Sequence, residues 1–260
     1  MSTAEEGSLP CFFLAEPPGE RPPQLAQGGA EHALKALRMK PGDHLEAIDG
    51  EGSRWRLKIV AATQRQLGLE TVGPPLREPA PGDPEAPLPW IEVNVAWPRK
   101  NRGADMLGRL VQLGAAAVNP MTARHQGPWE SPSEPPERWF RIAREACKQS
   151  GRSWLPRLGS RVSPQSLAED RKGCPIALLD PHRGMAFDTW ARSLLPLQGG
   201  MGTKERPIVL AIGPEGGFAH DEKEALWMVG ATSVRLTPHI LRVETAAEAA
   251  LAVAGTILAR

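Results

Sequence analysis

Three segments in the last third of the chain carry the residues best suited to ligand binding. Each follows a predicted strand and interrupts it with proline or glycine: PHRG at 181–184, PEGGF at 214–218 and TPHILRVET at 237–245. Such residues leave backbone N–H and C=O groups unpaired and open to a flat heterocycle. Any one of these segments alone is an ordinary turn between strand and helix. Three at one sheet edge predict a composite pocket for a nucleotide-like ligand.

Other familiar sites of chemistry are missing from the sequence. There is no GxxxxGK[ST] or GxSxG motif, and no GxGxxG run between a predicted strand and a helix, which argues against a P-loop, a nucleophile elbow or a dinucleotide fingerprint. His182, His220 and His239 lack the close spacing of zinc ligands, so we interpret them as surface or loop residues and expect no metal. Cys147 lies in a predicted helix and is interpreted as a core thiol.

Alternating strands and helices are expected to position the three segments. Thr245 and Glu248 form a capping-box pattern near the start of the last predicted helix. The alternation is typical of an α/β fold with a parallel sheet covered on both faces, whose ligands bind beyond the carboxyl ends of the strands. The predicted strands are 91–96, 116–118, 176–179, 208–212 and 234–236, and the predicted helices are 104–113, 136–149, 220–229 and 246–258.

A small β-rich module is expected in front of this domain. Residues 31–40 predict a short helix, and residues 45–48, 55–60 and 67–72 predict strands. Glycines between the first two strands indicate a hairpin turn.

A proline-rich stretch separates the two parts. Residues 73–89 include seven prolines in seventeen positions, which predicts a stiff, extended linker. We therefore divide the chain into a first domain at 1–72, a linker at 73–89 and a second domain at 90–260.

The composition is that of an ordinary folded protein. Of 260 residues, 41% are hydrophobic and 23% are charged, so extensive disorder is not expected. No apolar run approaches the roughly 18 residues of a membrane-spanning helix, and the acidic N-terminal segment is unlike a signal peptide. Three widely spaced cysteines fit a reducing compartment. We expect a cytoplasmic protein that does not bind membranes.

The net charge of +1 conceals a local excess of positive charge. Residues 1–85 carry a net charge of −4, whereas residues 98–172 carry +7. Such a concentration is typical of a surface that binds nucleic-acid phosphates, although arginine-rich helices also occur as plain solvated faces. The overall charge therefore does not exclude an RNA partner.

Several motifs together resemble those of one known family. They are HALKALRMKPGDHLEAIDGEG at 32–52, QLGAAAVNPMTAR at 112–124, EACKQSGRSWLPRL at 145–158, IGPEGGF at 212–218 and LTPHILRVETAAEAAL at 236–251. In this order, they resemble the RsmE family of 16S ribosomal RNA (uracil-N3)-methyltransferases in the SPOUT (trefoil-knot) superfamily. The pairing of IGPEGG with a downstream LRxET is specific, whereas GPEGG alone is not. The chain departs from the family pattern at Arg109, Gln112, Ser150 and His239.

The resemblance implies a fold, a cofactor and an assembly. It implies a PUA-like RNA-binding β-barrel over residues 1–72, a SPOUT methyltransferase domain with a C-terminal trefoil knot over residues 90–260, and a homodimer. The alanine-rich last helix would lie at the dimer interface, although internal packing is an equally simple reading. The implied cofactor is S-adenosyl-L-methionine, bound by Leu179, Gly213, Pro214, Glu215, Gly216, Gly217, Leu236, Leu241 and Arg242.

The resemblance further implies methylation of N3 of a uridine in small-subunit ribosomal RNA. Arg242 is our first candidate for stabilising negative charge on the base, and Glu215 and Glu244 are candidate bases, although Glu244 is equally suited to orienting the last helix. The expected phosphate contacts are Arg38, Arg124, Arg141, Arg144 and Arg152. Two alternatives remain open: a non-catalytic RNA-binding or ribosome-assembly protein with this scaffold, and a methyltransferase acting on transfer RNA.

Overall fold

The computed structural model describes residues 9–19, 21–64, 66–99, 101–126 and 131–260. The chain divides into two compact units. The smaller comprises Met1–Ala80 together with Cys147–Leu155, and the larger comprises Pro81–Ala146 and Pro156–Arg260. Among the described residues, no helix combines the length and the apolar character needed to cross a bilayer.

The smaller unit is built on a five-stranded sheet. Strands β1, β2, β3 and β4 lie in that order, β5 pairs with β3, and β1 runs parallel to β2. Residues in β3 alternate between buried and exposed as far as Ile59, as expected for a strand with one face on the core. The strands are β1 (Cys11–Phe13), β2 (His44–Ile48), β3 (Ser53–Ala62), β4 (Leu67–Thr71) and β5 (Leu76–Arg77).

The helix predicted at 31–40 is wrong in extent. The structure has a short α1 (Gly29–Glu31) that continues into a π-helix, η1 (His32–Ala36). Arg38 then adopts a left-handed conformation with φ of 54°, which cannot continue a right-handed helix. Beyond it, Pro41 disfavours helical geometry at the preceding residue.

Part of the predicted linker and one distant segment belong to the smaller unit. Leu76 and Arg77 pair with β3, so the first residues of the proline-rich stretch form a strand. The side chain of Arg54 donates to Glu46, to Glu78 and to the carbonyl of Gly151. The indole of Trp154 donates to the carbonyl of Glu78 at 3.1 Å. These contacts explain why Cys147–Leu155 groups with the strands of the smaller unit.

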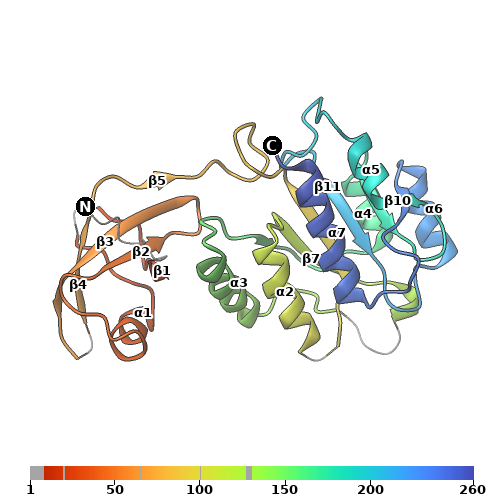
Figure 1. Ribbon diagram of the computed structural model, residues 1–260. Helices are drawn as coiled ribbons and strands as arrows, with labels where there is room; N and C mark the ends of the chain where they lie inside the picture. The colour runs from red at the N-terminus through yellow and green to blue at the C-terminus, as the bar shows by residue number, and fades with distance from the viewer. Residues whose placement is uncertain (1–8, 20, 65, 100, 127–130) are drawn as a thin grey trace. The chain divides into compact units, whose positions relative to one another are not determined.

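The larger unit contains a seven-stranded sheet in which every pair of neighbouring strands is parallel (Figure 1). Its order is β10-β12-β9-β11-β6-β7-β8. Strands β6, β9 and β11 have the predicted bounds. The members are β6 (Ile91–Ala96), β7 (Ala117–Met121), β8 (Arg157–Leu158), β9 (Ile176–Leu179), β10 (Met185–Ala186), β11 (Ile208–Ile212) and β12 (Thr232–Arg235).

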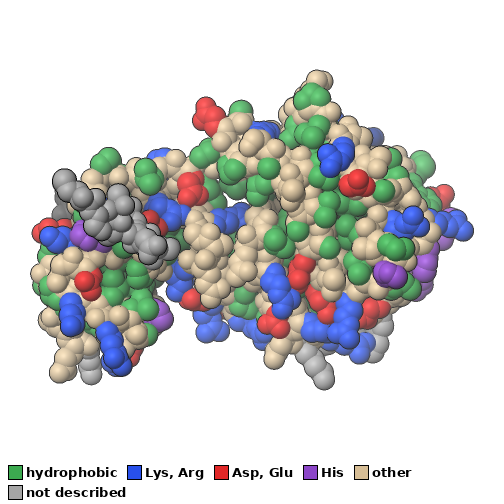
Figure 2. Space-filling model, viewed as in Figure 1, with side chains coloured by type: hydrophobic (Ala, Val, Ile, Leu, Met, Phe, Trp, Pro, Cys, Tyr) green, Lys and Arg blue, Asp and Glu red, His purple; other side chains and the backbone are tan. Residues whose placement is uncertain are grey.

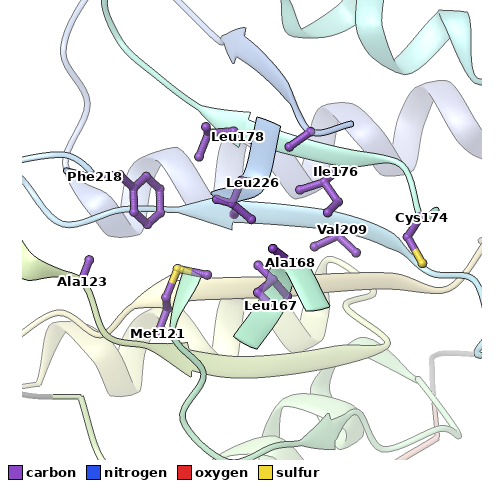
Figure 3. Close-up of a cluster of buried hydrophobic side chains, with 12 residues drawn as sticks. Met121, Ala123, Leu167, Ala168, Cys174, Ile176, Leu178, Val209, Phe218 and Leu226 are labelled. Atoms are coloured by element: carbon purple, nitrogen blue, oxygen red, sulfur yellow. The ribbon is translucent and has the colours of Figure 1, made fainter. Parts of the chain in front are cut away.

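Helices pack on the two faces of this sheet. Helix α7 lies against β6, β11, α2 and α5, whereas α4 packs against α6. Figure 3 shows an apolar cluster that brings together Leu167 of α4, Leu226 of α6 and Val209 of β11. The helices are α2 (Arg102–Gln112), α3 (Glu137–Ser150), α4 (Pro164–Asp170), α5 (Phe187–Ser193), α6 (His220–Met228) and α7 (Val243–Leu258), with a 3₁₀ turn, η2 (Arg124–Gln126).

Helix α7 starts earlier than predicted, and Cys147 is buried as predicted. Helix α7 begins at Val243 with Arg242 as its N-cap, so the start predicted from the Thr245 capping-box pattern is one turn too late. Cys147 is fully buried in α3, as expected of a core thiol, and burial raises its pKa to about 11.

Candidate active site

The three proline- and glycine-containing segments meet around one cavity. They follow β9, β11 and β12, which are neighbours in the sheet, so their carboxyl ends open at the same edge. Eight of the nine predicted cofactor-binding residues line this cavity: Leu179, Gly213, Pro214, Glu215, Gly216, Gly217, Leu236 and Leu241. The ninth, Arg242, is exposed at the N-cap of α7 and does not line it.

The PEGGF loop is shaped by close packing on η2. A Cβ atom on Gly216 would lie 2.9 Å from Cβ and 3.0 Å from the carbonyl oxygen of His125, too close for any larger residue. Nδ1 of His125 lies 3.2 Å from the carbonyl oxygen of Gly216. Gly217 has a φ of 69°, a conformation that glycine adopts without strain. The two glycines therefore allow the loop to turn directly against η2.

A buried carboxylate ties η2 to the start of α6. The side chain of Glu222 is buried, and its Oε1 accepts the backbone N–H of Arg124 at 2.8 Å. Its Oε2 accepts the backbone N–H of Ala219 at 2.7 Å, satisfying one of the unpaired donors at the helix N-terminus. Arg124 also donates to Asp221 at 2.5 Å.

An ion pair stands in the wall of the cavity after β9. Oδ2 of Asp180 lies 2.6 Å from Nζ of Lys223, and Oδ1 accepts the backbone N–H of His182 at 2.9 Å. Burial acts to raise the pKa of Asp180, but the hydrogen bonds from Lys223 and His182 outweigh it and hold the pKa below the ordinary aspartate value. Both Asp180 and Lys223 line the cavity, and sequence reasoning had singled out neither.

A second charged cluster lies beside Glu215. Arg102, the first residue of α2, has Nη1 3.2 Å from Oε1 of Glu244 and 3.8 Å from Oε1 of Glu215. The Glu244 side chain is 11% exposed, whereas that of Glu215 is 72% exposed. Arg102 was not singled out in the sequence. It follows β6, the strand beside β11, so the rule that ligands bind at carboxyl ends of strands would have pointed to it.

The arginines expected to contact phosphate come from both units and differ in exposure and pairing. Arg38 is exposed after η1, and Arg141 and Arg144 are exposed on α3. Arg124 is paired with Asp221. Arg152 is partly buried, and burial lowers its pKa below the ordinary arginine value. Figure 2 shows Lys and Arg side chains interleaved with acidic ones near the N-terminal end of α7.

Comparison with known proteins places this architecture in a family. Residues 84–255 match the model of an RNA methyltransferase domain, and residues 29–70 match that of an RNA methyltransferase PUA domain. The ribosomal RNA small subunit methyltransferase E of Synechocystis sp. is 32% identical over 90% of this chain and 73% of its own length. The chain belongs to the ribosomal RNA small subunit methyltransferase E family. A member from Mycobacterium tuberculosis is 28% identical over 88% of this chain and 84% of its own length.

Solved structures agree with this family fold. The probable rRNA-methyltransferase of Porphyromonas gingivalis superimposes with a TM-score of 0.76 and 26% identity, covering 96% of this chain and 98% of that one. The Neisseria gonorrhoeae ribosomal RNA small subunit methyltransferase E, solved bound to S-adenosyl methionine, has a TM-score of 0.71 and 22% identity, covering the same shares. The predicted parallel-sheet α/β fold with an N-terminal PUA domain is confirmed.

Proposed function

We propose that this protein transfers a methyl group from S-adenosyl-L-methionine to N3 of a uridine in small-subunit ribosomal RNA. The observation that carries the proposal is the cavity at the carboxyl ends of β9, β11 and β12, lined by the segments that resemble the family motifs. The family membership supports the same activity.

The residues around the cavity fit the proposed cofactor. Leu179, Ile212, Leu236 and Leu241 supply apolar surface for an adenine ring. The two glycines of the PEGGF loop, Gly216 and Gly217, line the cavity with backbone groups that no side chain obstructs. We propose that the eight predicted residues lining the cavity hold the cofactor, with Arg242 at the adjoining helix N-terminus. When bound, the cofactor supplies a methyl group activated by a sulfonium.

The tasks left to the chain are to position the uracil and to handle its N3 proton. N3 gains the methyl carbon as the carbon–sulfur bond breaks, and its proton leaves to a base or to water. Glu215, exposed and lining the cavity, is the better placed candidate base. Glu244 is buried, and its Oε1 is paired with Arg102 at 3.2 Å, which favours the orienting role considered for it. We propose that Arg242, which belongs to the segment that resembles the family motif, stabilises negative charge on the base.

The remaining parts of the proposal concern RNA, assembly and location. We propose that the PUA domain and the arginines Arg38, Arg124, Arg141, Arg144 and Arg152 contact ribosomal RNA. We also propose a trefoil knot in the C-terminal part, a homodimer and a cytoplasmic location. Buried residues of α7, including Ala247, Ala250 and Ala254, pack within the larger unit, which supports the internal-packing reading for that face of the helix.

The test uses small ribosomal subunits from a strain that lacks the modification. The purified protein and the cofactor are added, and primer extension maps the product, because methylation at N3 blocks base pairing and stops the polymerase. A new stop at one uridine is the expected result. No stop with subunits, but a product with transfer RNA, would favour the transfer RNA alternative. The absence of cofactor binding in calorimetry would favour the non-catalytic alternative.

A further inference from the structure

Arg102 lies between Glu215 and Glu244, the two residues that we consider as candidate bases. Its guanidinium lies within 3.2 Å of Glu244 and 3.8 Å of Glu215. The three residues come from three separate places, namely the first turn of α2, the loop after β11 and the first turn of α7. Because Glu215 lines the cavity, the guanidinium lies beside the cavity rim.

Burial of Glu244 gives its partner a defined position. A carboxylate removed from water requires a cation or hydrogen-bond donors to remain charged, and Arg102 supplies both through Nη1. The first turn of α7 also favours a negative charge at Glu244. The next arginine of α2, Arg109, is paired with a different glutamate of α7, Glu248, at 2.9 Å. Glu244 therefore acts as an anchor for Arg102.

The anchored guanidinium retains donors for a ligand. Arginine has five N–H donors in a rigid plane, and the bond to Glu244 uses one of them. The Arg102 side chain is 39% exposed. A uracil that loses its N3 proton spreads negative charge over O2 and O4, and a planar, already oriented guanidinium is well suited to such a group.

We propose, on the basis of the function proposed above, that Arg102 is a catalytic residue. Its guanidinium donates to a carbonyl oxygen next to N3 of the target uracil and stabilises the charge that develops there. Glu244 is the positioning residue that holds Arg102. Glu215, which lines the cavity 3.8 Å from Arg102, takes the N3 proton.

The experiment compares Arg102→Ala with Arg109→Ala. Both variants remove an arginine of α2 that pairs with a glutamate of α7, so Arg109→Ala is the matched control. We expect Arg102→Ala to lower kcat by about 100- to 1,000-fold, the usual loss when one preorganised donor is removed. Cofactor affinity in calorimetry should stay within about threefold of wild type, because the group acts on the base. Arg109→Ala should leave kcat within about threefold.

Two further variants separate a catalytic from a structural role. Arg102→Lys restores the charge without the planar donors, so its kcat should exceed that of Arg102→Ala by about tenfold and stay below wild type. Glu244→Gln should lower kcat by about tenfold through loss of the charged anchor, again with cofactor affinity maintained. If thermal unfolding shows that Arg102→Ala is not folded, Arg102→Gln takes its place under the same criteria.

Defined outcomes overturn the inference. If wild type methylates its RNA and Arg102→Ala does so equally well, Arg102 is not catalytic. Equal losses in Arg102→Ala and Arg109→Ala, or a loss of cofactor affinity as large as the loss of kcat, would also overturn it. A wild-type protein that binds the cofactor but methylates no RNA refutes the proposed function itself, and this inference with it.

Discussion

The carboxylate of Glu222 accepts a hydrogen bond from the backbone N–H of Arg124 at 2.8 Å, although 98 residues separate the two in the chain. The same carboxylate accepts the N–H of Ala219 at the start of α6. The turn containing Arg124 also contains His125, which packs against Gly216. One buried side chain thus supports the loop that forms a wall of the cavity.

Replacing Glu222 by alanine should weaken both the fold and the cavity. The change leaves two backbone N–H groups without their acceptor, and hydrogen bonds to charged groups contribute about 1.5–3 kcal/mol each. We expect the free energy of unfolding, measured in urea, to fall by about 3 kcal/mol, and cofactor affinity in calorimetry to fall by about tenfold. Glu224→Ala removes an exposed carboxylate from the same helix and should cost less than about 0.5 kcal/mol. Unchanged cofactor binding in Glu222→Ala would contradict the supporting role.

Replacing Gly216 by alanine should impair both cofactor binding and stability. The added Cβ would lie 2.9 Å from His125 and must displace the loop or η2. Because the loop lies at the cavity, we expect cofactor affinity to fall by about tenfold or more, while the free energy of unfolding falls by about 1–3 kcal/mol. Gly108→Ala is the control, since its Cβ would meet only Ile142 at an ordinary 3.7 Å. Normal affinity in Gly216→Ala would show that the close approach to His125 is not needed.

The sequence predicts the three central strands of the larger sheet with their observed bounds, for a physical reason, whereas β8 and β10 were not predicted. Strands β9 and β11 are continuous apolar runs, whereas β6 carries the buried polar residues Glu92 and Asn94 among apolar ones. Nearly every residue in the three strands is buried. Such strands are delimited by the prolines and glycines around them, so their bounds can be read without tertiary information. The same breakers predicted which loops would meet at the cavity.

Other features depend on contacts between distant residues. The pairing of Arg102 with Glu244 spans 142 residues and follows from the place of α7 beside α2, which no local pattern specifies. Likewise, Cys147–Leu155 joins the strands of the smaller unit through Arg54 and Trp154. Helix α4 was not among the predicted helices, although Ser163 and Ser166 form a reciprocal cap around Pro164 at its start.

Asp180 should make stability depend on pH in the acidic range. Its pKa is lowered in the folded protein, so it binds a proton more readily when unfolded, and its contribution is complete above the ordinary aspartate pKa of about 3.9. That contribution is lost as the pH falls through the lowered folded-state pKa. We therefore expect the free energy of unfolding of wild type to fall below about pH 4 more steeply than that of Asp180→Asn. Glu224→Gln, which alters an exposed carboxylate, should show the same pH dependence as wild type. An equally steep fall in Asp180→Asn would show that Asp180 is not the source of the pH dependence.

The arginines of α3 should contribute to the salt dependence of RNA binding. Each phosphate contact contributes roughly 0.7–0.9 to the slope of log K against log salt concentration, and Arg141 and Arg144 are exposed on that helix. For the double variant Arg141→Ala/Arg144→Ala, we expect binding to a small-subunit ribosomal RNA fragment, followed by fluorescence anisotropy, to lose about 1.4–1.8 from the slope. Arg192→Ala removes an exposed arginine of α5, outside the segment of +7 charge, and should leave the slope unchanged. An equal slope in the double variant and wild type would show that these arginines form a solvated face, because contacts that release no counterions cannot alter the salt dependence.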